Sequence, residues 1–279
     1  MFPVLQITII LSMHKQAIGV FDSGIGGLTI LRALRKALPH ENFIYFGDTA
    51  NVPYGGKSKA MVTRLATAVA QFLQTQQVKL IVVACNTASA QALPALSKSL
   101  SVPVMGVIAP GAQAAVSATK NHKIAVLGTQ GTIESRAYVK AIKKHNKKLR
   151  VFQQACPLFV PLAEEGFAHK PAAELIAREY LAPVQKSGAD TVILGCTHYP
   201  ILKEMIARVL GKKISLVDSA ETLAQAVKSF LKTHRMTAVA GRRGSLKLYA
   251  SDAPQKFSRS AQKLLNEKVA RATLKKLTL

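Results

Sequence analysis

The sequence has no tryptophan, and aromatic residues make up only 6% of its 279 positions. Hydrophobic residues still account for 49% of the chain, so the apolar mass is mainly Ala, Val, Leu and Ile. Such aliphatic content is typical of strands buried between helices. The length suits either one large domain or two of ordinary size.

Cysteine is also scarce, with Cys85, Cys156 and Cys196 as the only three in the chain. An odd number in a chain of this length is not a disulfide framework. Free thiols indicate a reducing setting, so we expect a cytoplasmic protein, and they leave open that some are kept for their reactivity. Cys156, which precedes Pro157, is interpreted as structural.

Acidic residues are few, with 14 Asp and Glu against 38 Lys and Arg, which gives a net charge of +24. The charge is concentrated in two places: residues 228–279 hold 13 basic and 2 acidic side chains, and a second cluster spans Lys140 to Arg150 (Lys140, Lys143, Lys144, Lys147, Lys148, Arg150). This favours acidic small molecules, nucleic acid or other anionic partners. Since no nucleic-acid motif and no basic–aromatic interleaving is present, a solvated basic surface is the preferred interpretation.

Long hydrophobic runs are absent except at the start, where residues 1–13 are apolar. A signal peptide opens with positive charge and ends at small residues, but the first Lys here is Lys15 and no such cleavage site follows. The run is too short to span a membrane. We therefore expect an extra segment ahead of the first strand, with Met13 as an alternative start, and no membrane association.

Short apolar runs alternate with helical patterns along the chain. Strands are predicted at 18–21, 43–46, 80–84 and 102–108, with helical spacing of Leu between 28 and 38 and an Ala-rich helix over 61–72. This β-α-β alternation predicts an α/β fold with parallel sheets covered by helices on both faces.

The same order of motifs then recurs. IGVFDSGIGG at Ile18 matches IAVLGTQGTI at Ile124, VPYG at Val52 matches VPLA at Val160, and KLIVVACNT at Lys79 matches DTVILGCTH at Asp190. Three collinear matches indicate two homologous parallel-sheet α/β domains related by pseudo-two-fold symmetry.

We expect the first domain to comprise residues 1–110 plus 221–279, and the second to comprise 111–220. The helix predicted over 221–230, the strand over 246–249 and the basic helix from Gln255 onward have no partner in the second half, so they should return to the first domain. Ligands of such sheets bind beyond the carboxyl ends of the strands, which places the active site in the cleft between the domains.

Cys85 and Cys196 occupy matched positions of the repeat, each at a strand end and before small polar residues that can start a helix. A helix N-terminus favours thiolate, so we expect the pKa of these thiols to be lowered. A disulfide or metal site is disfavoured because the chain has no CxxC pair and only His198 lies near. Racemisation fits better, since it needs one base and one acid on opposite faces of a carbon and no cofactor or metal.

Asp22, in DSGIGG, and His198 could relay the proton of a neighbouring thiol. The alternatives are a helix cap for Asp22 and a structural histidine. The glycines Gly24, Gly26 and Gly27 do not complete G-x-G-x-x-G, so nucleotide binding is poorly supported. Hydroxyl and amide side chains suit the carboxylates and ammonium of an amino acid. The candidates for substrate contact are Ser23, Asn86, Thr87, Thr197, and Thr129 or Thr132, with Tyr54 and Gly55 as lining.

Four motifs, IGVFDSGIGGLTILRAL, YFGDTANVPYG, ACNTAS and GCTHYP, together resemble the glutamate racemases of the aspartate/glutamate racemase superfamily. The resemblance runs from about Ile18 to Phe230. It implies a cofactor-independent cytoplasmic enzyme that interconverts L- and D-glutamate and supplies D-glutamate for peptidoglycan, commonly as a homodimer.

The resemblance also implies roles for single residues. Cys85 and Cys196 would be the two proton donors and acceptors, with Asp22 and His198 assisting. Substrate contacts would fall at Asp22-Ser23, Tyr54-Gly55, Asn86-Thr87 and Thr197-His198. The leading apolar segment and the strong positive charge depart from the family pattern. Two alternatives stay open: an aspartate or related amino-acid racemase, and a non-enzymatic binder of DNA or of a DNA-processing protein.

Overall fold

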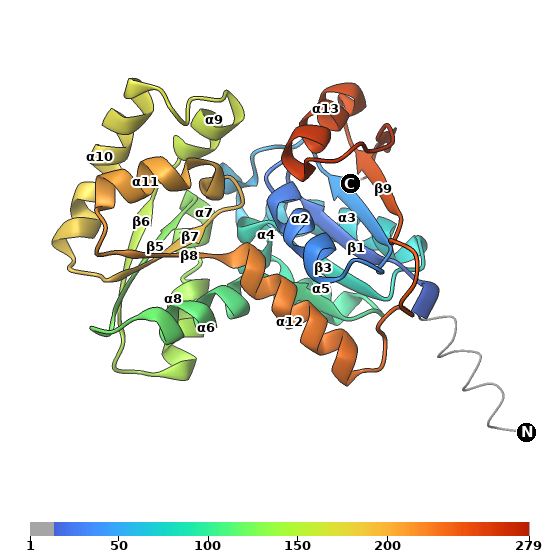
Figure 1. Cartoon of the computed structure of the whole chain (residues 1–279), viewed down its shortest axis with the longest axis horizontal. Helices are drawn as coiled ribbons and strands as arrows, with labels where there is room; N and C mark the ends of the chain where they lie inside the picture. Colours follow the sequence, from blue (N-terminus) through green and yellow to red (C-terminus); the bar gives the residue numbers. More distant parts are fainter. Residues whose placement is uncertain (1–13, 279) are drawn as a thin grey trace, which may run out of the picture.

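The computed structural model describes residues 14–278, and the prediction of an extra segment at 1–13 lies outside them. The chain forms two parallel sheets flanked by helices, one in each half of the molecule (Figure 1). The first has the order β10-β9-β2-β1-β3-β4, and the second has the order β6-β5-β7-β8. The predicted fold class is confirmed.

The first half is built on four strands that the sequence predicted: β1 (Ile18–Asp22), β2 (Phe43–Gly47), β3 (Leu80–Val83) and β4 (Val104–Gly106). Around them lie α2 (Leu28–Ala37), η1 (Tyr54–Gly56), α3 (Lys59–Thr75), α4 (Asn86–Gln91) and α5 (Leu93–Ser99). The strand expected over 102–108 is shorter than predicted. The backbone turns helical at Val107, which caps α6 (Ile108–Ala118), so the last apolar residues belong to a helix.

The second half repeats this plan. Its strands are β5 (Lys123–Gly128), β6 (Arg150–Ala155), β7 (Thr191–Gly195) and β8 (Ser215–Asp218). Its helices are α7 (Gln130–Glu134), α8 (Ala137–His145), α9 (Phe159–Glu164), α10 (Pro171–Lys186), η2 (Tyr199–Leu202) and α11 (Lys203–Leu210). The order β6-β5-β7-β8 matches β2-β1-β3-β4, so β3 and β7, the strands before the two matched cysteines, hold equivalent places.

After β8 the chain crosses back through α12 (Ser219–Thr233), which packs along α2. It ends with β9 (Leu246–Ala250), α13 (Pro254–Leu265) and β10 (Thr273–Leu274). Because β9 pairs with β2, the last segments join the first sheet. The domain boundaries at 110 and 221 stay a prediction, which this pairing supports.

One core cluster continues from one half into the other. Val20 of β1, Val126 of β5 and Leu223 of α12 all belong to it, and each is fully buried. The crossing helices α6 and α12 therefore join the two halves through apolar packing as well as through the chain. No helix within residues 14–278 has both the length and the apolar character needed to cross a membrane.

Candidate active site

A narrow pocket lies where the carboxyl ends of the two sheets meet, and both matched cysteines line it. Cys85 follows β3 and Cys196 follows β7, and their exposed fractions are 5% and 6%. The rest of the lining comes from both halves: Ser23, Pro53, Tyr54, Gly55, Asn86, Thr87, Thr129, Val160, Thr197 and His198. Asp22 and Thr132 lie behind this lining, so all the predicted site residues gather at one place.

Cys85 lies in an environment that favours the protonated thiol. Its sulfur lies 3.9 Å from Oγ of Ser23. Burial and, after it, the nearby charge of Asp22 together raise the pKa of Cys85 to about 12, although a hydrogen bond from the backbone N–H of Ala88 works in the opposite direction. The expectation that the helix start lowers the pKa of this thiol is therefore wrong. The helix that follows, α4, has only 6 residues, and desolvation outweighs its N–H groups.

Asp22 ends β1 with its side chain fully buried. Its Oδ2 accepts a hydrogen bond from the backbone N–H of Gly24 at 3.0 Å, and its Oδ1 accepts one from Oγ1 of Thr197 at 3.2 Å. The carboxylate thus ties the first loop of one half to the Cys196 loop of the other. It does not cap α2, whose N-cap is Gly27.

His198 lies between a thiol and a carboxylate. Its Nδ1 is 3.8 Å from the sulfur of Cys196, and its Nε2 is 2.9 Å from Oε1 of Glu164 at the end of α9. Burial alone would lower the pKa of His198, but the hydrogen bonds to Cys196 and Glu164 outweigh it and raise the pKa to about 10. A protonated His198 can donate from both ring nitrogens, one to each partner.

Three threonine hydroxyls connect the halves on the other side of the pocket. Oγ1 of Thr87 lies 2.8 Å from Oγ1 of Thr129, which lies 3.0 Å from Oγ1 of Thr132. Gly55 contacts the same group closely, since a Cβ at this position would lie 2.6 Å from Cβ of Thr129. Any larger residue at position 55 would therefore force Thr129 or the backbone around Gly55 to shift.

Three residues at or behind the pocket were not identified from the sequence: Glu164, Tyr138 and Asp48. Tyr138 accepts a hydrogen bond from Nδ2 of Asn86 at 2.9 Å. Asp48 accepts one from the hydroxyl of Tyr54, a residue that lines the pocket, at 2.6 Å. The only signal for Glu164 was its closeness to the repeated Val160-Pro161, while Tyr138 and Asp48 lie in no repeated motif.

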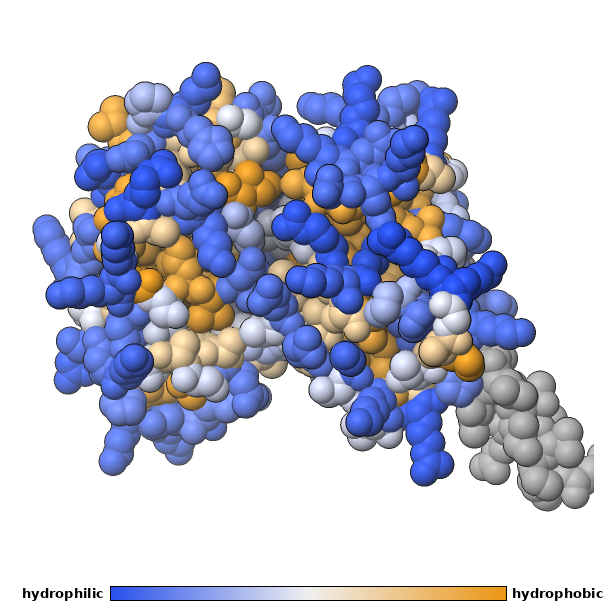
Figure 2. Space-filling view, viewed as in Figure 1, coloured by the Kyte–Doolittle hydropathy of each residue, from blue (hydrophilic) through white to orange (hydrophobic). Residues whose placement is uncertain are grey.

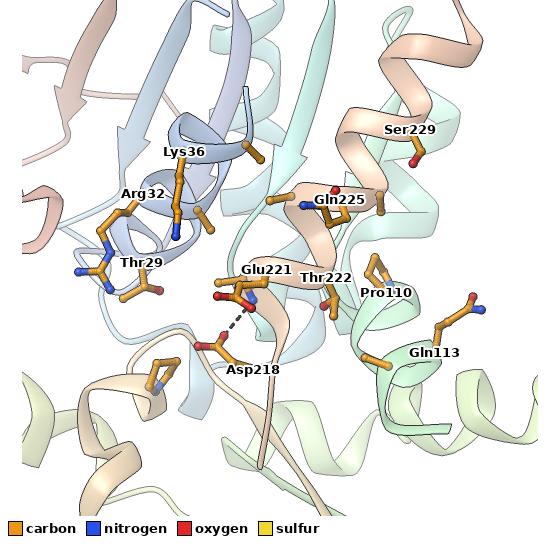
Figure 3. A pocket seen from close by; sticks show the side chains of 17 residues that line it. Thr29, Arg32, Lys36, Pro110, Gln113, Asp218, Glu221, Thr222, Gln225 and Ser229 are labelled. Carbon is orange, nitrogen blue, oxygen red and sulfur yellow. Dashed lines mark hydrogen bonds between the residues drawn. The ribbon is translucent and has the colours of Figure 1, made fainter. Parts of the chain in front are cut away.

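The pocket is nearly closed, with about 10 Å³ of space, or room for about one water molecule. A much larger pocket of about 1180 Å³ lies between α2, α6 and α12, and no predicted site residue lines it (Figure 3). There Arg32 and Lys36 on α2 face Asp218 and Glu221 at the start of α12, so charges of both signs share the space. The reactive side chains therefore lie in the smaller pocket.

Cys156 is fully buried in the core of the second half, where Phe159 and Tyr199 belong to the same cluster. Its thiol makes a weak contact of 3.7 Å with the carbonyl of Gln154. It does not line the pocket, in keeping with its structural interpretation. Within residues 14–278, no group of three or more His, Cys, Asp or Glu side chains is placed to hold a metal ion.

Comparison with known proteins gives consistent matches. The model of the Asp/Glu/hydantoin racemase family matches residues 27–227. A glutamate racemase from Geobacter metallireducens is 50% identical over 257 residues, covering 92% of this chain and 95% of that protein.

Comparison with solved structures gives matches of the same kind. The glutamate racemase of Thermus thermophilus in complex with β-chloro-D-alanine is 47% identical with a TM-score of 0.85. That of Francisella tularensis in complex with D-glutamate is 37% identical with a TM-score of 0.88. Each match covers 94% of this chain and 98% of the solved chain.

Proposed function

The chain belongs to the Asp/Glu/hydantoin racemase family, and we propose that it interconverts L- and D-glutamate by proton transfer between Cα and two cysteines, Cys85 and Cys196. One observation carries the proposal: two thiols at equivalent strand ends of two like-ordered sheets line one pocket. Racemisation needs a proton removed from one face of Cα and another delivered to the opposite face. The glutamate specificity is supported by the 50% identity to a glutamate racemase over nearly the whole chain.

The proton balance of the reaction follows from the two thiols. A thiolate takes the Cα proton, the electron pair stays on the substrate as a carbanion, and the opposite thiol gives its proton to the other face. The raised pKa of Cys85 makes it the proton donor of the resting enzyme. Cys196 is then the base for the enantiomer whose Cα–H faces it. After that turnover the thiol and thiolate have exchanged places, which prepares the enzyme for the other enantiomer.

Asp22 and His198 assist from opposite sides. The negative charge of Asp22 favours a protonated Cys85, so this thiol is kept ready to deliver its proton. His198, protonated and held by Glu164, can donate a hydrogen bond from Nδ1 to the sulfur of Cys196. Glu164 acts through His198 and is a positioning residue in this scheme.

Hydroxyl and amide groups around the two sulfurs would hold the substrate. The proposed contacts are Ser23, Asn86, Thr87, Thr129, Thr132 and Thr197, with Asp22, His198, Gly55 and Tyr54 beside them. Pockets that hold small molecules usually enclose about 300 Å³ or more, which the present closed pocket does not. Binding of glutamate therefore requires the halves to separate and then to close on the substrate, which excludes water from the carbanion.

The cellular setting belongs to the same proposal. A cytoplasmic enzyme would fit the three free cysteines, and D-glutamate would be supplied for peptidoglycan. The proposal includes a homodimer, supported by the sequence motifs shared with the family. Light scattering of the purified chain tests this part, since a mass near 30.0 kDa would mean a monomer.

The test of the activity is isotope exchange. D-glutamate in heavy water, with enzyme and a thiol reductant but no added cofactor, should exchange its Cα proton for deuterium and racemise. L-glutamate should behave likewise, and L- and D-aspartate should react far more slowly. If neither glutamate enantiomer exchanges or racemises, the proposed function is wrong. Faster turnover of aspartate would contradict the substrate and leave the two-thiol chemistry standing.

A further inference from the structure

A strongly basic surface lies at the end of the second sheet opposite the pocket. Lys123 begins β5 and pairs with Arg150, which begins β6. The loops before these strands and the end of α8 add four lysines. We call this surface the basic edge; it consists of Lys120, Lys123, Lys144, Lys147, Lys148 and Arg150. Five of the six side chains are exposed, and Lys123 is half-buried. The edge faces away from the first half, and long hydrophilic side chains project from this side (Figures 1 and 2).

Carboxylates are missing from the basic edge. Residues 119–124 and 143–150 contain no Asp or Glu. The adjacent carboxylate, Asp190, is used within the turn: its oxygens accept hydrogen bonds from Oγ1 of Thr119 and from the backbone N–H groups of Lys120 and Asn121, each at 2.7 Å. Among the described residues, 14–278, none of the six basic side chains forms a salt bridge.

Stabilisation of a helix C-terminus accounts for only one of the six basic side chains of the basic edge. A cation near a helix C-terminus stabilises the helix dipole, which explains Lys144 in the last turn of α8. Lys120, Lys147 and Lys148 lie in loops, and Arg150 and Lys123 lie in strands. Like charges crowded in this way repel one another, so they lower stability unless a partner neutralises them.

The surface also indicates the kind of partner. The exposed large hydrophobic residues of the described chain, such as Leu175 and Val239, lie outside the basic edge, so nothing there would insert into a lipid bilayer. Residues 119–124 and 143–150 contain no Phe, Tyr or Trp on which unpaired bases could stack. The regularly spaced phosphates of a nucleic-acid duplex fit a basic surface that offers neither apolar nor aromatic side chains. We infer that the basic edge binds the backbone of duplex nucleic acid, independently of base sequence and separately from the racemase pocket.

Fluorescence anisotropy with a labelled DNA duplex of about 25 base pairs tests the inference on the full chain. About four phosphate contacts should give a log–log slope of affinity against salt of about −3 to −4, or a loss of roughly 100-fold between 50 and 200 mM salt. The triple variant Lys144→Ser, Lys147→Ser, Lys148→Ser should bind at least about tenfold more weakly at 50 mM salt, with a slope near −1.

A matched triple variant controls for net charge. Lys228, Lys232 and Arg235 are exposed near the end of α12, and replacing all three with Ser removes the same charge elsewhere. This variant should keep most of the affinity, and both variants should racemise glutamate at the rate of the unchanged chain. The inference is overturned by no binding at 50 mM salt or by equal losses in the two variants. It is also overturned by tighter binding to single-stranded DNA or to phosphatidylserine vesicles than to the duplex.

Discussion

The side-chain amide of Asn86 donates a hydrogen bond to the hydroxyl of Tyr138, which also lies 3.3 Å from Oγ of Ser219 at the start of α12. Asn86 lines the pocket, whereas Tyr138 and Ser219 lie behind it, all three buried. The contact joins a proposed substrate-binding residue to the second half and to the helix that crosses between the halves. It therefore links the orientation of the amide to how the two halves are packed.

Replacing Tyr138 with Phe should impair substrate binding without removing the reactive groups. The change leaves the buried Nδ2 of Asn86 without its acceptor, a loss of about 1–3 kcal/mol. Because Asn86 is proposed to contact glutamate, KM should rise about tenfold while kcat falls less. Steady-state kinetics measure the changes in KM and in kcat separately. Tyr180→Phe is the control, since that hydroxyl accepts a bond from the N–H of Leu158 away from the pocket. Unchanged KM and kcat in Tyr138→Phe would contradict the positioning role.

Serine at either matched cysteine should nearly abolish racemisation. Cys85→Ser and Cys196→Ser each replace a thiol with a far weaker acid, so one face of Cα loses its proton donor and acceptor. We expect losses of about 100-fold or more in kcat, measured with each enantiomer in turn. Cys156→Ala is the matched control, because this thiol is buried outside the pocket, and it should keep near-normal turnover. Near-normal turnover in either serine variant would exclude the two-thiol mechanism.

The contacts of His198 with Cys196 and with Glu164 should make stability depend on pH. The pKa of His198 is raised from 6.5 to about 10 in the folded chain, so the imidazolium contributes its full stabilisation below about pH 6.5. That contribution is lost as the pH rises towards 10. Glu164→Gln weakens the charged hydrogen bond, and the side chain of Glu164 is 29% exposed, so we expect a cost of about 1–2 kcal/mol at low pH.

Urea unfolding of the two proteins at several pH values measures this difference. The gap between the unchanged chain and Glu164→Gln should be largest near pH 6 and should shrink towards pH 10. Glu165→Gln removes the same charge from the neighbouring position, which has no contact with His198, and should show no such trend. A gap that is constant with pH would mean that Glu164 does not hold the charge of His198.

The sequence predicted that the two thiols follow matched strands of two parallel sheets, but it did not predict the environment of those thiols. The repeat placed Cys85 and Cys196 after equivalent strands of the two sheets, and ligands of such sheets bind beyond the carboxyl ends of the strands, so both thiols were expected in the cleft between the halves. The pKa of Cys85 could not be predicted in this way. It depends on burial, which arises only when the loops of both halves cover the thiol.

Glu164 and Tyr138 show why some residues of the site could not be identified from the sequence. Each acts on a pocket residue from outside the recognised motifs: Glu164 lies at the end of α9, just after the repeated VPLA, and Tyr138 lies on α8. Their contacts with His198 and Asn86 span 34 and 52 residues of sequence. Hydrophobic periodicity predicts which face of a helix is buried, but it does not predict which polar group on that face meets a partner.

Breaking the buried ion pair of Lys79 with Glu41 should destabilise the first half. Nζ of Lys79 lies 2.6 Å from Oε2 of Glu41 and donates to the carbonyl of Met236, and the side chains are 0% and 2% exposed. Lys79→Met should lower the free energy of unfolding by about 3–5 kcal/mol, because it leaves a buried carboxylate unpaired. Adding Glu41→Gln removes that charge and keeps an acceptor for the N–H of Ala238, so it should recover part of the loss. Denaturant unfolding compares the three proteins, and a double variant less stable than Lys79→Met would show that the unpaired charge is not the cause.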